Sequence, residues 1–237
     1  MSRVFLDIDI GDKVQYAAEA AEWERACKFL SSSGVSYGLS GATPSHLDDA
    51  GKELLLEVYG SDPAAADGPI RTEPPACLRV GRLEIELNDK EAPKAAANFR
   101  ALCSGEKGIS KESKKPLHYK DVPFHRIQSG FVAQGGDVTR FDGSGGESIY
   151  GKKFNDEKDG LKLKHDGPGV ISMANSGKNS NSSQFFVTLD KTPQCDGKHV
   201  VVGKVVVGLE VVHKMAACSS AGGTPTRNVW VSDCGVL

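Results

Sequence analysis

The sequence predicts a mostly β protein in which short strands close into a barrel, with a separate helical segment near the N-terminus. Hydrophobic residues make up 39% and charged residues 25% of the 237 residues, as in an ordinary globular protein. From residue 78 onward, short apolar runs alternate with glycine-rich turns and only two stretches have a helical pattern. Many short strands with few helices are typical of a closed β-barrel. Residues 12–76 differ in composition and indicate a second unit.

The strands follow from β-branched and apolar residues that alternate with polar ones. Residues 4–10 form the first strand, and residues 78–87, in which every second residue from Leu83 is apolar, form the next. Shorter apolar runs predict the remaining strands, at residues 130–134, 169–173, 184–188, 199–207 and 229–233. Helices are expected over 93–103 and 209–218, where apolar residues share one side.

The segment between the first two strands is acidic. Residues 12–76 carry 11 acidic and 5 basic side chains, a net charge of −6, which leaves +4 for the rest of a chain whose net charge is −2. We therefore divide the chain into residues 1–11 (the first strand), 12–77 (an acidic helical insertion with a Pro-rich linker) and 78–237 (the remainder of the barrel domain).

Two helices are predicted inside the acidic segment. Asp12 begins the first, and Gln15 three residues later would complete a capping box. Its apolar face is expected to hold Tyr16, Ala20, Trp23, Cys27 and Leu30. The second helix is expected from Pro44, the first helical position, to Gly60, with its face formed by Leu47, Ala50, Leu54 and Val58. Because an αα-hairpin buries little surface, it is expected to pack on the larger domain or on a protein partner.

Composition and cysteine spacing exclude several classes. The near-balance of 29 basic and 31 acidic side chains argues against a partner such as nucleic acid or an anionic membrane. No apolar run approaches the ~18–20 residues that cross a bilayer, and the N-terminus lacks a signal-peptide pattern. The six cysteines form no CxxC pair, so neither a metal nor another cofactor is expected. Reduced thiols in the cytoplasm, with the nucleus left open, are the expectation.

Many short motifs from residue 78 onward resemble those of the cyclophilin family of peptidyl-prolyl cis–trans isomerases. They occur in the family's order, at residues 98–102, 105–108, 124–127, 130–131, 134–137, 148–151, 167–169, 172–175, 183–186, 196–201 and 233–235. The resemblance implies an eight-stranded antiparallel barrel capped by two helices, with residues 12–77 inserted in the first hairpin. It also implies an enzyme that rotates Xaa-Pro peptide bonds in peptides and proteins.

The resemblance assigns the catalytic site to Arg126, Phe131, Gln134, Phe186 and His199. An apolar pocket would hold the proline ring, and the permanently charged Arg126 would bind the proline nitrogen as the bond twists. Gln134 would orient Arg126 or the substrate carbonyl. By pattern alone, Phe131 and Phe186 are equally typical of core residues, and His199 of a hydrogen-bonded structural histidine.

Four further residues would bind the peptide around the proline: Gly143, Ala174, Asn175 and Gln184. For each of them the alternative is a turn or strand residue that satisfies its own backbone. Three positions depart from the family pattern. Val132 stands where Met is common, Gln194 where Trp is frequent, and Cys195 where Leu is frequent. The loss of an indole N–H and of apolar surface predicts retained activity but weakened binding of a cyclosporin-like ligand.

The stretch 107–120 is longer than in the shortest family members and is similar to the divergent-loop subclass. In that subclass, cysteines at the positions of Cys103 and Cys234 are proposed to respond to redox state; the alternative is two small buried residues. Besides the isomerase, two hypotheses stay open: a proline-peptide binding scaffold with incidental activity, and a redox-responsive module. A hydrolase is not expected, because no Ser, His and Asp are evidently placed to activate a nucleophile.

Overall fold

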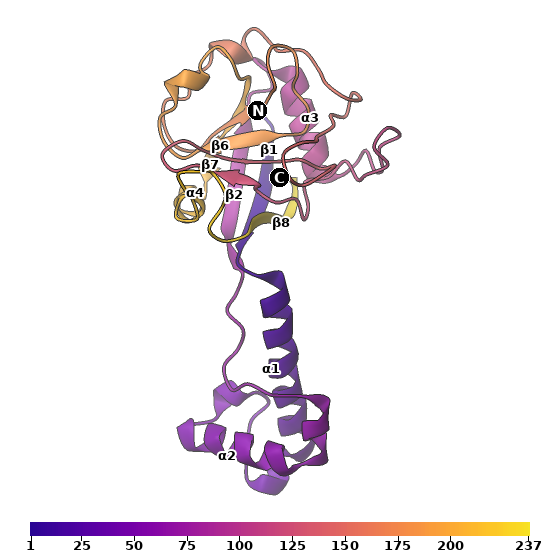
Figure 1. The fold of residues 1–237 in the computed structure, drawn as a ribbon, viewed down its shortest axis with the longest axis vertical. Coiled ribbons are helices and arrows are strands. Elements are labelled where there is room, and N and C mark those ends of the chain that lie inside the picture. Colours follow the sequence, from indigo (N-terminus) through magenta and orange to yellow (C-terminus); the bar gives the residue numbers. More distant parts are fainter. The chain divides into compact units, whose positions relative to one another are not determined.

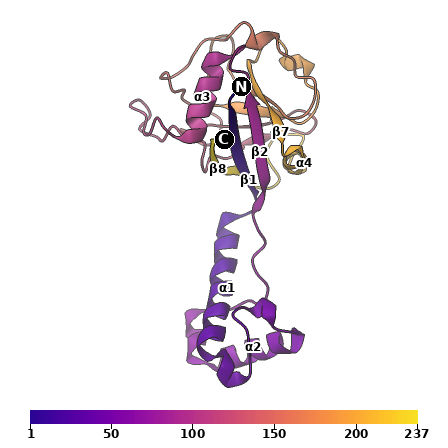
Figure 2. The same ribbon diagram turned by 180° about the vertical axis from the view of Figure 1, so that it is seen from behind.

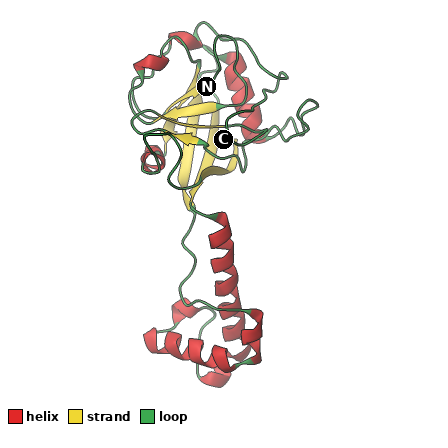
Figure 3. Cartoon of the chain, in the orientation of Figure 1, coloured by secondary structure: helices red, strands yellow, loops and turns green.

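The computed structural model describes all residues from 1 to 237, which form two compact units. The first unit comprises Met1–Gly11 and Arg79–Leu237, and the second comprises Asp12–Leu78. Figure 3 shows that the strands all belong to the first unit, while the second contains only helices and loops. None of the helices combines the length and apolarity that crossing a bilayer requires.

Eight antiparallel strands form one sheet in the first unit (Figure 1). They are β1 Arg3–Ile10, β2 Arg79–Leu87, β3 Arg126–Ile127, β4 Val132–Gly135, β5 Val170–Met173, β6 Phe185–Thr188, β7 Val201–Val207 and β8 Val229–Val236. Their order across the sheet is β3-β4-β6-β5-β7-β2-β1-β8. The mostly β prediction is therefore confirmed, and all seven strands that alternation or short apolar runs predicted are present, whereas the two-residue β3 was not predicted.

The predicted closure of the barrel is not found in the strand pairing, which gives a half-barrel with β3 and β8 at its edges. The segment before β3 meets β8 through one isolated bridge, between Pro123 and Trp230. The Phe124 and Asp121 backbone N–H groups donate to β8 carbonyls at 2.8 and 2.7 Å. A regular ladder cannot continue there, because Pro123 has no N–H and Asp121 has a positive φ of 65°.

The core of this unit lies between the sheet and two helices, α3 Pro93–Ser104 and α4 Leu209–Ala216. Figure 2 shows α3 alongside β1 and β8, which it contacts, and α4 contacts β2. Phe99 of α3 packs edge-on against Phe185 at 5.0 Å between ring centroids, and Tyr119 lies 5.1 Å from Phe99. These fully buried rings tie the helix to the strand that also carries Phe186.

The second unit is built from α1 Lys13–Ser33 and α2 Asp49–Ser61, with 3₁₀ turns at Gly34–Tyr37, Pro44–His46 and Pro63–Asp67. Asp12 caps α1, because its carboxylate accepts from the backbone N–H groups of Val14 and Gln15 at 2.8 and 3.1 Å. The reciprocal half of a capping box is absent, since the Gln15 side chain donates to Glu19 instead.

The predicted start of the second helix was wrong. Pro44 opens only a single 3₁₀ turn, and α2 begins at Asp49 because the Asp48 carboxylate accepts from the Gly51 N–H at 2.8 Å. The predicted faces also need correction. Leu30 is buried and Leu47 and Val58 pack against the same cluster, as predicted, but Tyr16, Ala50 and Leu54 are exposed. The other buried members of this cluster are Phe29, Leu39, Leu55 and Tyr59. Phe29 and Tyr59 join the two helices, because their rings pack edge-on with 5.2 Å between centroids.

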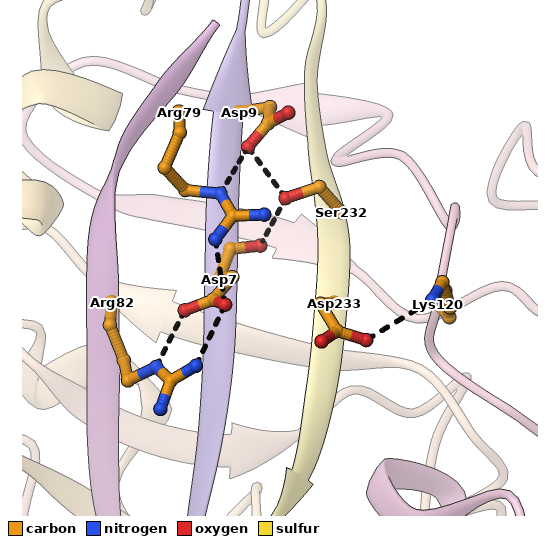
Figure 4. Close-up of polar contacts among 7 residues, drawn as sticks. All are labelled: Asp7, Asp9, Arg79, Arg82, Lys120, Ser232 and Asp233. Atoms are coloured by element: carbon orange, nitrogen blue, oxygen red, sulfur yellow. Dashed lines mark hydrogen bonds and ion pairs between the residues drawn. The ribbon is translucent and has the colours of Figure 1, made fainter.

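The first unit is braced by an ionic network where β1 ends and β2 begins (Figure 4). Asp7 is 2% exposed, and its carboxylate accepts from Arg82 Nε at 2.7 Å, Arg82 Nη2 at 2.9 Å and Arg79 Nη1 at 2.7 Å. Arg79 Nε also donates to Asp9 at 2.7 Å, and the Ser232 hydroxyl of β8 donates to the Asp7 carbonyl. The network therefore joins β1, β2 and β8 at the point where the chain leaves for the helical unit.

Candidate active site

The site begins with a row of side chains across four strands. Arg126 of β3 lies opposite Gln134 of β4, Gln134 opposite Phe186 of β6, and Phe186 opposite Ser172 of β5. Side chains alternate between the two faces of a strand. The next row along the sheet therefore faces the other way, into the main core, and consists of Ile127, Ala133, Val187 and Ile171.

Beside this row lies a small apolar cluster that is separate from the main core. Its buried members are Val132, Ala174, Phe186 and Cys195, with the partly exposed Phe131 packed against them. They come from β4, from the residue after β5, from β6 and from the 3₁₀ turn Pro193–Cys195. A half-covered apolar surface edged by polar side chains has the character of a binding pocket rather than of the core.

Arg126 is exposed on the first residue of β3, and its guanidinium donates to Gln128 two residues away. The hydrogen bond between Gln134 and Arg126 that the sequence allowed is not formed. Gln134 Nε2 instead donates to Gln184 Oε1 at 2.8 Å. The cation therefore stands at the solvent side of the row, with Gln134 between it and Phe186.

His199 closes another side of the apolar cluster. Its ring packs edge-on against Phe186, with 5.1 Å between ring centroids. Nδ1 donates to the Met173 carbonyl at 3.0 Å, since a carbonyl can only accept. Burial lowers the pKa of His199 below 6.5, so the ring is neutral at pH 7. Its contribution here is shape and hydrogen bonding rather than charge.

The four residues that the sequence assigned to peptide binding meet at a polar cavity of about 280 Å³, together with Gln134. Gln184 Nε2 donates to the Gly143 and Gly145 carbonyls at 2.8 and 2.7 Å. Asn175 Nδ2 donates to the Lys198 carbonyl at 2.8 Å, which fixes the loop before His199. Gly143 has a φ of +90°, and a Cβ there would lie 2.5 Å from the His125 ring, so only glycine fits.

Two residues at or beside the cavity were given no role in the sequence analysis. Asp137, buried beneath the loop, accepts from the Gly143 and Gly145 N–H groups at 3.0 and 2.9 Å and so holds the loop in place. Burial raises the pKa of Asp137, but backbone donors outweigh it and lower the pKa below 3.8. Lys153 Nζ donates to Ser176 Oγ at 3.0 Å, and both residues line the cavity. The position of Asp137 three residues after Gln134 was the one clue that could have pointed to it.

A Ser–His–Asp chain, which the sequence was not expected to contain, lies behind Phe186. His165 Nδ1 bonds Asp196 Oδ1 at 2.9 Å, and Nε2 bonds Ser172 Oγ at 2.8 Å. This is the hydrogen-bond order of a catalytic triad. Ser172, however, is 0% exposed, so its oxygen has no access to a substrate. The sequence could not reveal this set, because His165 and Asp196 are separated by 31 residues.

Cys103 lies in α3 and Cys234 in β8, and both are buried. Burial raises the pKa of Cys103 well above 9, and burial raises that of Cys234 to about 12. Each thiol adds to the electrostatic environment of Tyr119, so the two cysteines share one region of the core. At neutral pH both are thiols, unlike the thiolates that react rapidly with oxidants.

The arrangement suits chemistry without covalent intermediates, since it offers a shaped apolar wall, fixed amide groups and the exposed cation of Arg126. Comparison with known families agrees with the geometry. Residues 76–236 match the family model described as cyclophilin type peptidyl-prolyl cis-trans isomerase/CLD. The match covers more than half of the chain and includes every strand except β1. The chain therefore belongs to the cyclophilin family of peptidyl-prolyl cis–trans isomerases.

Proposed function

We propose that the chain isomerises Xaa-Pro bonds by seating the proline ring against the apolar cluster around Phe186 while Arg126 binds the nitrogen of the twisted bond. The observation that carries this proposal is the row Arg126–Gln134–Phe186, which sets a permanent cation two strands away from an apolar wall. Family membership supplies the reaction itself.

The chemistry requires differential binding of a twisted state. Resonance in the planar bond imposes a barrier of ~18–20 kcal/mol, and uncatalysed exchange takes tens to hundreds of seconds. As the bond twists, the proline nitrogen regains its lone pair, which a guanidinium N–H can then bind more strongly than it binds the planar nitrogen. An acceleration of ~10⁴–10⁵ requires roughly 5.5–7 kcal/mol of such preference.

For Arg126 to act, its exposed guanidinium must leave the half-buried Gln128, to which it donates. Gln134 and Gln184 hold each other and the Gly143 loop, so the amide groups along the cavity are already fixed before substrate binds. This fixed frame supports binding of the peptide backbone on the side of the proline occupied by Asn175 and Ala174.

The decisive experiment is exchange of an Ala-Pro peptide, followed by NMR, for Arg126→Ala, Arg126→Lys and a surface control, Arg227→Ala. We expect Arg126→Ala to lower kcat/KM by about 10²–10³-fold, as loss of one transition-state donor does elsewhere. Arg126→Lys keeps the charge without the planar fork and should be intermediate. Activity of folded Arg126→Ala within twofold of the Arg227→Ala control would refute the role of this arginine.

We further propose that cyclosporin binds weakly. Val132 and Cys195 contribute to the buried cluster, and Gln194 is exposed beside it, so the wall is shorter and lacks an indole donor. Gln194→Trp combined with Cys195→Leu should tighten cyclosporin binding, measured by calorimetry, while peptide turnover changes little. Tight binding by the unaltered protein would contradict this proposal.

We infer that the Asp12–Leu78 unit is an inserted module that binds a protein partner. It has its own buried cluster around Phe29 and Tyr59, and it contributes no residue to the cluster or the cavity described above. Its acidic composition favours a basic partner surface. Pull-down with this unit intact and with residues 12–77 replaced by a short turn tests the idea, and equal capture would contradict it.

A further inference from the structure

One buried histidine lies just outside the apolar cluster and contacts three parts of its wall. The His165 ring is 1% exposed and stacks on Phe186, with 5.8 Å between centroids and 26° between planes. Phe186 therefore contacts two imidazoles, since His199 packs edge-on against it at 5.1 Å. These two ring contacts restrict the Phe186 side chain in addition to its strand pairing.

His165 also fixes the segment that carries Cys195 and His199. Its ring Nδ1 and its backbone N–H both meet Asp196 Oδ1, at 2.9 and 3.0 Å. Its carbonyl accepts from the Thr192 N–H at 2.9 Å. Three hydrogen bonds thus attach one residue to both ends of the turn that includes Cys195.

The protonation of this pair follows from the carboxylate. Hydrogen bonds from His165 lower the pKa of Asp196 to about 2, so Asp196 is ionised at neutral pH and only accepts. His165 Nδ1 therefore carries a proton and donates it. Nε2 bonds the Ser172 hydroxyl at 2.8 Å, which attaches the ring to β5. All hydrogen-bonding atoms of the imidazole are used, and none remains for a substrate.

We propose that His165 is a positioning residue for the isomerase, which sets the distance between Phe186 and the segment carrying Cys195 and His199. The inference rests on the proposed proline pocket and extends it to a residue that touches no substrate. Three walls of the pocket, from β5, β6 and the turn Pro193–Cys195, meet at this one side chain. Without His165, the backbone of each wall stays in place, but the side-chain contacts that fix the walls relative to one another are lost.

The consequence is a change in substrate binding rather than in the twisting step. In the proposed pocket, Phe186 and Cys195 would contact the proline ring in the planar and twisted states alike, so loosening them would weaken binding of both. We expect His165→Phe, which keeps a stacked ring but removes the ring hydrogen bonds, to raise KM about tenfold while kcat changes less than about threefold. Asp196→Ala, which removes the same link from the other end, should raise KM similarly. The double variant should be no worse than either alone.

The experiment measures KM and kcat on an Ala-Pro peptide for His165→Phe, Asp196→Ala, their combination, and His213→Phe as control. His213 is an exposed histidine on α4, away from the cluster, and should leave both constants unchanged. The His199 ring proton signals in NMR provide a local readout, because they depend on the orientation of Phe186. These signals should shift in His165→Phe and not in His213→Phe.

Unchanged KM and unchanged His199 signals in folded His165→Phe would overturn the proposal, as would a fall in kcat at constant KM. If His165→Phe does not fold, Asp196→Ala decides, since the Asp196 side chain is 21% exposed whereas that of His165 is fully buried. Arg126→Ala measured alongside separates the two claims. Loss of activity there with no KM effect of the His165 and Asp196 variants would leave the proposed function standing and reject this inference alone.

Discussion

Removing the Asp7 carboxylate tests the ionic network between β1 and β2. Asp7→Ala deletes an acceptor that is 2% exposed and takes three N–H donors from Arg79 and Arg82, at 2.7 to 2.9 Å. The two guanidiniums then face each other without their shared carboxylate. Asp9 remains beside Arg79 as its second partner. Asp233 provides a matched control, because it pairs with Lys120 at 3.3 Å on the same side of the sheet (Figure 4).

The expected loss follows from burial. Breaking a buried ion pair by removing one partner costs about 3–5 kcal/mol, mostly because a charge is left without compensation. Here the arginine side chains are 42% and 44% exposed, so water can solvate them in part. We therefore expect a loss of about 3 kcal/mol in the free energy of unfolding, at the lower end of that range. The pair of Asp233 and Lys120 is half-exposed on both sides, and its loss should cost under about 0.5 kcal/mol.

Urea unfolding followed by tryptophan fluorescence measures the difference. Trp23 lies in the helical unit and Trp230 in β8, so a Trp23→Phe background makes the signal report on the sheet alone. Asp7→Ala should shift the urea midpoint at constant slope. If Asp7→Ala and Asp233→Ala agree within about 0.5 kcal/mol, the network does not brace the sheet as its geometry implies.

Three further outcomes are expected. Replacing residues 12–77 with a short turn should leave kcat/KM on a tetrapeptide within about twofold, as insertions between adjacent strand ends usually allow; loss of activity in a folded product would contradict this. The folded pKa of Asp196, about 2, lies below its unfolded value of 3.8, so its contribution to stability is present above 3.8 and lost as pH falls towards 2. The free energy of unfolding, measured by urea titration between about pH 5 and 2, should depend less steeply on pH for Asp196→Asn than for the unaltered protein. Alkylation followed by mass spectrometry should label exposed Cys77 first and the buried Cys103 and Cys234 far more slowly, whereas equal rates would disprove their protection.

Sequence patterns predicted most of the sheet because alternation is a local property. In β2, apolar side chains from Leu83 to Leu87 face the core at every second residue, and that spacing is readable without any partner strand. The two-residue β3 exists only because Gln134 lies opposite Arg126, a relation that no local pattern contains. The prediction of a closed barrel was wrong for a similar reason. It depends on how the segment around Pro123 meets β8.

In the helical unit, local sequence signals predicted one helix start correctly and the other incorrectly. The capping preference of Asp12 placed the start of α1 correctly. Pro44 suits a first helical position, but the Asp48 carboxylate caps the N–H of Gly51 and moves the start of α2 to Asp49. For the candidate site, family motifs gave the residues but not their hydrogen bonds. The side chain of Gln134 donates to Gln184, and Arg126 donates to Gln128, so the two residues that the motifs suggested as partners each have another partner.

The pairing of Asp9 with Arg79 has a consequence for the order of folding. These neighbours are 70 positions apart in the chain, so an unstructured intervening segment makes the first hairpin a long-range event. Closing such a loop costs about 2.5 kcal/mol more than closing a four-residue turn. A helical unit that forms early shortens the effective loop and removes much of that entropy. Synthesis in the N-to-C direction completes this unit before β2 emerges. The ends of the helical unit are then already close together when β2 pairs with β1.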